Sequence, residues 1–300
     1  FLHFRQFSRS FIAFLIYIYY NYKNIGYSFG KGIFMIPDFH LHTSFSGDCS
    51  APVKQQLEQA VSLGMKELCI TDHNDYCVDS GDIDFNLDFE AYFSALSKLK
   101  EEYKDRIHLN IGVEMGLQPF LAQYCKEIAL RYPFDFIIGS VHFVNGRDPY
   151  YPEYFKGRSP SEAYLEYFQT VLHCLQSCND FDVLGHLDYV IRYGPDNIFS
   201  PSEEPFVSCI EQILSLLIEK GKGLECNTCG YRYGLGQPNP SAFILEKYRK
   251  MGGQIITLGS DAHEPANIGR DFKRGAELLK ACGFSYYSVF RQRQPVFFKL

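Results

Sequence analysis

Short apolar runs alternate with amphipathic segments from Met35 to the end of the chain. Each apolar run is of the kind that a parallel sheet buries on both faces, and the segments between the runs place apolar residues at helical spacing. The pattern predicts seven strands, within residues 36–42, 65–73, 107–116, 134–144, 181–190, 222–228 and 254–263.

Helices are predicted between these strands, within residues 50–64, 88–103, 159–176, 203–221, 240–253 and 267–283. In the first of them Ser50 is the predicted N-cap, Pro52 lies in the first turn and Gly64 follows the end. Repeated strand–helix units of this number predict an α/β fold, a distorted (β/α)7 barrel of the TIM-like kind. A doubly wound open sheet is the alternative.

Residues 1–34 differ in character from the rest of the chain. They contain neither methionine nor an acidic residue, and are rich in Phe, Tyr, Ile, Asn and Lys, whose codons are A/T-rich. Their apolar run, residues 11–20, is about half the ~20 residues of a membrane-spanning helix. We therefore expect residues 1–34 to be a non-native read-through extension, and residues 35–300 to form a single domain. A membrane anchor is the less favoured interpretation.

The net charge of −6 argues against a partner such as nucleic acid, whose phosphate backbone calls for a basic face. A small phosphorylated substrate remains compatible, because metal ions supply positive charge locally. The ten cysteines show no disulfide-framework spacing, which indicates reduced thiols and a cytoplasmic location. The sequence indicates neither a membrane partner nor an oligomeric state.

Almost every predicted strand ends in an ionisable side chain. Because the carboxyl ends of barrel strands meet on one face, these side chains should converge there although they are far apart in the sequence. A single histidine at a strand end is more often a hydrogen-bonded core residue than a ligand. Burying so many ionisable groups without partners is costly, however, and divalent cations would compensate them. The ionisable residues at the ends of the predicted strands are His40, His42, Asp72, His73, Glu114, His142, His186, Asp188, Asp261 and His263.

Seven motifs together give the sequence a family resemblance. They are "DFHLHTSFSGD", "ITDHND", "GVEMG", "GSVHF", "GHLDYVIRY", "LECNTCGYR" and "LGSDAH", in that order along residues 35–290. With them the chain resembles the polymerase and histidinol-phosphatase (PHP) superfamily, and within it the monofunctional histidinol-phosphatases. The two cysteines of "LECNTCGYR" depart from the family pattern.

The resemblance implies a seven-stranded βα barrel that holds two to three divalent metal ions, zinc, manganese or iron. Carried over by motif, one site would comprise His40, His42, Glu114 and Asp261. A second would comprise Asp48, His73 and His263, and Glu114 would bridge to a third completed by His142 and His186.

The resemblance also implies phosphomonoester hydrolysis in histidine biosynthesis, with L-histidinol phosphate as substrate and L-histidinol and phosphate as products. Arginines bind phosphate oxygens well, and Arg192, Arg232 and Arg158 are the candidates. Asp261 and His263 are the candidates for relaying a proton to the leaving alkoxide. Asp72 and Asp188 are expected to orient ligands or to contact the substrate amine.

Other functions compete with this one. A phosphoesterase for other small phosphorylated metabolites or nucleotides would use the same metal ligands. A polymerase proofreading module would need a basic, aromatic groove. A metal-dependent amidohydrolase would want a lysine where Glu114 or His142 stands, and a decayed, purely regulatory barrel should have lost ligands.

Overall fold

The computed structural model describes residues 35–78, 81, 83–194 and 200–300. The expectations for residues 1–34 fall outside this part of the chain. Among the described helices, none is both long enough and apolar enough to span a bilayer.

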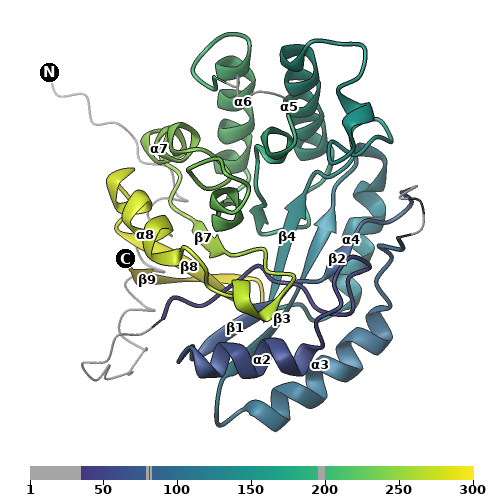
Figure 1. The fold of residues 1–300 in the computed structure, drawn as a ribbon, viewed down its shortest axis with the longest axis vertical. Helices are drawn as coiled ribbons and strands as arrows, with labels where there is room; N and C mark the ends of the chain where they lie inside the picture. The colour runs from purple at the N-terminus through teal and green to yellow at the C-terminus, as the bar shows by residue number, and fades with distance from the viewer. Residues whose placement is uncertain (1–34, 79–80, 82, 195–199) are drawn as a thin grey trace, which may run out of the picture. The chain divides into compact units, whose positions relative to one another are not determined.

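A parallel sheet of seven strands forms the centre of the domain (Figure 1). Its hydrogen-bonded order is β1-β3-β4-β5-β6-β7, with the short β2 pairing with the C-terminal half of β3. Nearly all strand residues are buried, as expected of a parallel sheet covered on both faces. The strands are β1 (Glu67–Ile70), β2 (His73–Asn74), β3 (His108–Gly116), β4 (Phe136–Ser140), β5 (Val183–Leu184), β6 (Gly223–Asn227) and β7 (Ile256–Gly259).

Residues 38–42 connect the two edges of this curled sheet. Asp38 forms a parallel bridge with Leu68 of β1, and Leu41 forms one with Ala262 just after β7. Backbone hydrogen bonds on both sides support these bridges: Cys69 N donates to Asp38 O at 2.9 Å, and Asp261 N donates to His40 O at 2.7 Å. The expected first strand, residues 36–42, is therefore a segment that bridges β1 and the residues after β7. The predicted distorted barrel is confirmed.

Figure 1 shows the helices arranged around the sheet. Each turns an apolar face inward; α6, for example, buries Ile210, Ile213, Leu214 and Leu217. The helices are α2 (Val53–Ser62), α3 (Phe89–Tyr103), α4 (Ala122–Arg131), α5 (Pro160–Ser177), α6 (Phe206–Glu219), α7 (Ala242–Lys250) and α8 (Phe272–Ala281).

Three local features differ from the expectations, and the first is the unpredicted helix α4 between β3 and β4. The predicted N-cap Ser50 is wrong: α2 begins at Val53, with the extended Pro52 in the cap position and no side-chain cap. After α8 the chain forms an unpredicted antiparallel hairpin of β8 (Tyr286–Arg291) and β9 (Gln294–Lys299).

Candidate metal centre

The carboxyl ends of the strands deliver the ionisable side chains to one place. Glu114 of β3 lies in register with His73 of β2. His142 and His186 each follow the last residue of their strand by two positions, and Asp261 follows β7 in the same way. Parallel strands bring these ends to a common face, so side chains that are distant in sequence become neighbours.

Glu114 is the centre of the cluster and is fully buried. Its Oε2 lies 3.0 Å from His73 Nδ1, 3.2 Å from His40 Nε2 and 3.5 Å from His42 Nε2. Its Oε1 lies 2.9 Å from His186 Nε2 and 3.2 Å from His142 Nε2. One carboxylate thus faces five imidazoles, as a bridging ligand between cations would.

Asp261 is a second carboxylate near the same nitrogen atoms of His40 and His42. Its Oδ1 is 3.4 Å from His42 Nε2 and 3.8 Å from His40 Nε2, while its Oδ2 faces Arg192. Asp261 adopts a positive φ of 54°, which is uncommon for a residue other than glycine and is often found where a side chain is held for function. The strained backbone aims this carboxylate at the histidines.

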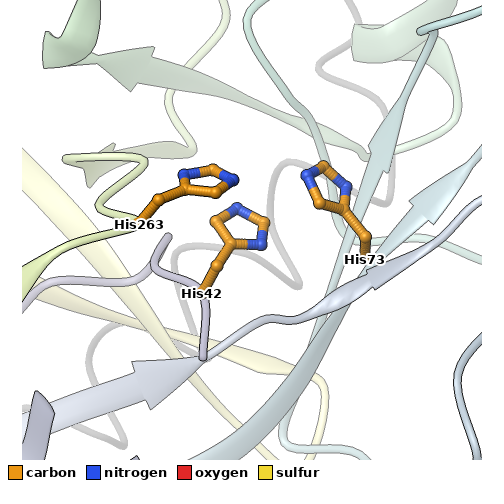
Figure 2. Close-up of side chains that lie close together, drawn as sticks. All are labelled: His42, His73 and His263. Carbon is orange, nitrogen blue, oxygen red and sulfur yellow. The ribbon is translucent and has the colours of Figure 1, made fainter. Parts of the chain in front are cut away.

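His263 adds a sixth imidazole, which forms a small group with His42 and His73. Figure 2 shows His42, His73 and His263 turned toward one another. The His42 ring centroid is 4.2 Å from that of His73 and 4.2 Å from that of His263. Asp48 completes the group, with Oδ2 3.2 Å from His263 Nε2 and 3.8 Å from His73 Nε2. The structure therefore gathers all nine predicted ligands at one end of the barrel.

The electrostatics of the cluster depend on burial and on the acids within it. Burial, with the neighbouring His263 and His73, lowers the pKa of His42 to about 3, so its nitrogen lone pair is free near neutrality. Burial opposes protonation of His142 as well, but Asp75 and Glu114 together raise its pKa to about 10. Protons on such imidazoles balance the acids, and cations can replace those protons.

Several buried ligand atoms have no well-aligned hydrogen-bond partner among the described residues. They are His40 Nε2, His42 Nε2, His73 Nδ1 and Glu114 Oε2, and the three nitrogens all lie within 3.5 Å of the oxygen. Unsatisfied buried polar atoms are costly and call for an explanation. Neutral imidazole and carboxylate donors at one point suit zinc, manganese or iron, so the residues fit the expected metals.

Two carboxylates that the sequence did not single out orient these histidines. Glu225 Oε1 lies 2.6 Å from His40 Nδ1, and Asp75 Oδ1 lies 2.9 Å from His142 Nδ1. Carboxylates in this position fix the ring and the tautomer of a metal-binding histidine. The available signal was an acid within the otherwise apolar β6, and an acid two residues beyond His73.

Asp72 and Asp188 are fully buried and bind protein groups. Asp72 accepts hydrogen bonds from Thr43 N at 2.6 Å and from the Ser46 hydroxyl at 2.6 Å. Asp188 accepts bonds from Asn239 and from the backbone of Ser241. Both carboxylates therefore hold loops of the site in place, and the alternative contact with a substrate amine has no support.

A pocket of about 370 Å³ opens onto the cluster, and Arg192 is one of the residues that line it. Its Nη1 donates to Asp261 Oδ2 at 3.1 Å and its Nε to Asn239 Oδ1 at 2.9 Å, while its buried Nη2 has no partner among the described residues. Arg232 lines an adjoining hollow of about 330 Å³ together with Arg192, and within the same part of the chain its buried Nη1 also lacks a partner. Two guanidinium groups thus have donors to spare beside the cluster.

Arg158 lies elsewhere. Its guanidinium forms an ion pair with Glu166 and donates to the carbonyl oxygen of Tyr154, and it lines neither hollow. The prediction that Arg158 contacts the phosphate is therefore not supported, because a nearby acid already occupies this arginine.

Comparison with known proteins agrees with this architecture. The model of the PHP domain matches residues 38–229. The chain belongs to the PHP domain family. Within this family, the histidinol-phosphatase of Lactococcus lactis is 32% identical over 257 residues, which cover 84% of this chain and 93% of the relative.

The fold of this chain also resembles that of a solved PHP structure. The crystal structure of histidinol phosphate phosphatase from Lactococcus lactis, complexed with zinc, L-histidinol and phosphate, superimposes with a TM-score of 0.80 at 29% identity. The match covers 88% of this chain and 100% of that one. The similarity to relatives named histidinol-phosphatases therefore extends over most of this chain.

Proposed function

We propose that this protein is a metal-dependent phosphomonoesterase that converts L-histidinol phosphate to L-histidinol and phosphate. One observation supports this most strongly: the carboxylate of Glu114 faces five imidazoles beneath a pocket that Arg192 lines, with Arg232 in the adjoining hollow. Its similarity to the Lactococcus lactis enzyme, whose structure contains L-histidinol and phosphate, favours this substrate.

The proposed metal ligands follow the distances within the cluster. His40, His42, Glu114 and Asp261 form one proposed set, and Asp48, His73 and His263 a second. Glu114, His142 and His186 form the third. Zinc, manganese or iron bound by such groups supplies an activated water and positive charge for the phosphate.

Arg192 and Arg232 are the proposed phosphate ligands from the protein. A guanidinium can donate two parallel hydrogen bonds to phosphate oxygens, and hydrogen bonds between charged groups are strong in a buried site. Arg192 is already fixed by Asn239 and Asp261, so little side-chain entropy remains to be lost when phosphate binds.

Asp261 and His263 are the proposed proton carriers for the leaving alkoxide. Both line the pocket, and the His263 side chain is 30% exposed, so it can exchange protons with solvent.

The proposed catalytic unit is residues 35–300. We propose a cytoplasmic location for it, because all ten cysteines are free in the structure and most are buried.

A substrate panel tests the proposed reaction. Protein reconstituted with zinc or manganese should hydrolyse L-histidinol phosphate at least ten times more efficiently, in kcat/KM, than glycerol phosphate or nucleoside monophosphates. A smaller preference would favour the alternative, a PHP phosphoesterase for other small phosphorylated metabolites or nucleotides. The absence of any phosphomonoesterase activity would contradict both.

A further inference from the structure

Besides residues of the cluster, the pocket is lined by five tyrosines and by Asp148. Tyr150 and Tyr233 are 56% and 45% exposed, which is high for aromatic side chains. Their rings contact the ring of Tyr193, with centroids 5.3 Å and 5.5 Å away. Exposed apolar surface gathered around a pocket is typical of a binding site for an organic group. The tyrosines of the pocket are Tyr150, Tyr151, Tyr189, Tyr193 and Tyr233.

Asp148 is the acid among these tyrosines. Its Oδ1 accepts hydrogen bonds from Tyr150 N at 2.8 Å and from the Tyr189 hydroxyl at 3.4 Å. Within the described residues no lysine or arginine forms an ion pair with it; the adjacent Arg147 is paired with Glu166. A half-buried carboxylate that accepts hydrogen bonds only from neutral groups among the described residues favours a cation from outside the protein.

Tyr189 connects Asp148 to the metal centre. While its hydroxyl reaches Asp148, its ring lies 5.3 Å from that of His142 and 5.2 Å from that of His186, centroid to centroid. Asp148 is thus one tyrosine side chain away from the cluster. A small molecule with its phosphate at the cluster can extend along Tyr189 to this carboxylate.

We propose that Asp148 determines specificity by binding an ammonium group on the leaving alcohol, while the surrounding tyrosines pack against the rest of that alcohol. This inference rests on the proposed function, since it assumes that phosphate esters bind with the phosphate at the cluster. It assigns the contact with the amine to Asp148, in place of the buried Asp72 and Asp188.

The test compares two phosphomonoesters with two variants. The substrates are L-histidinol phosphate and its analogue with hydrogen in place of the amino group. Asp148→Asn keeps the acceptor oxygen for Tyr150 and Tyr189 but removes the charge. The control Asp105→Asn removes one charge from an exposed position in the loop after α3. The measured quantity is kcat/KM for each pair.

Asp148→Asn should lower kcat/KM for L-histidinol phosphate about 10- to 100-fold, the value of a hydrogen bond between charged groups. For the analogue it should change kcat/KM less than threefold, and Asp105→Asn should change neither. Equal losses on both substrates would overturn the proposal, because they would indicate a structural role. An unchanged kcat/KM on both would overturn it too.

The substrate proposal can fail separately. If the wild type shows no preference for L-histidinol phosphate, the same comparison with ethanolamine phosphate and ethyl phosphate decides the role of Asp148. A preference for the ammonium compound that Asp148→Asn abolishes would support it, and a preference that survives the substitution, or none in the wild type, would overturn it.

Discussion

Glu225 of β6 and His40 share a buried hydrogen bond of 2.6 Å between Oε1 and Nδ1. The other oxygen of Glu225 accepts hydrogen bonds from His186 N at 2.9 Å and from Asn227 Nδ2 at 3.2 Å. A single carboxylate therefore fixes the ring of one proposed metal ligand and the backbone of another. Glu225 is a positioning residue for the metal centre.

Glu225→Gln should weaken metal binding about 10- to 100-fold, the usual effect of changing a group that orients a metal ligand. The glutamine has a similar shape but no charge to favour the Nδ1–H tautomer of His40. Metal content after dialysis against graded chelator measures the change, and Glu219→Gln, at an exposed position of α6, is the matched control. Equal metal retention in both variants would argue against the positioning role.

Gly259, at the end of β7, provides space for both members of this pair. A Cβ there would lie 2.2 Å from Glu225 Oε1 and 2.4 Å from the Cβ of His40, too close for either to stay in place. Gly259→Ala should therefore lower metal content and activity although every proposed ligand is present. Metal analysis at 4 °C and thermal unfolding measure this together; a variant with full metal content and wild-type activity would show that the site tolerates the shift.

Arg192→Lys should lower kcat/KM for the phosphomonoester about 10- to 100-fold, mainly through KM. Lysine keeps the charge but cannot bind Asn239, Asp261 and a phosphate oxygen at the same time. Steady-state kinetics measures the change. Arg158→Lys is the control, and we expect little effect from it because Arg158 is paired with Glu166. If the two variants behave alike, the phosphate role of Arg192 is wrong.

Metal binding should release protons even at pH 7.5. Burial opposes protonation of His142, but Asp75 and Glu114 raise its pKa to about 10, so in the metal-free protein this imidazole is still charged at that pH. A cation must displace the proton, so affinity should increase as the pH increases toward that pKa. Calorimetric titrations in buffers of different ionisation enthalpy count the protons. Asp75→Asn should reduce the number released, and no release at pH 7.5 in the wild type would contradict this account.

The sequence predicted the site better than the secondary structure around it. Strand ends could be located because His142, His186 and Asp261 come at the ends of apolar runs. The parallel arrangement of the strands then brings these three side chains together. Helix α4 was missed because only Cys125 and Ile128 are buried along it, which is too narrow an apolar stripe to recognise.

The C-terminal hairpin was missed because its turn lacks the usual residues. Gln292 and Arg293 both have positive φ, 49° and 63°, where Asn-Gly would be expected. Tertiary contacts hold this turn: Gln292 N donates to Asp135 Oδ1 at 3.2 Å, and Arg293 pairs with Asp182 at 2.6 Å. Such contacts leave no local signal in the sequence.

Glu225 and Asp148 could not be assigned from the sequence for a similar reason. Glu225 contacts His40, which is 185 positions away in the sequence, and the position of Glu225 within β6 does not indicate which side chain it contacts. Asp148 lies in a loop among tyrosines, and only the structure shows that it lines the pocket and that no described lysine or arginine forms an ion pair with it.

The central claim is that nine dispersed side chains hold the cations on which phosphomonoester hydrolysis depends. The most direct measurement is the kcat for L-histidinol phosphate before exhaustive chelation, after it, and after zinc or manganese is added back. We predict that chelation lowers kcat more than 100-fold, an order-of-magnitude value for loss of metal-ion catalysis, and that added metal restores it. Full turnover by the thoroughly chelated protein would contradict the claim.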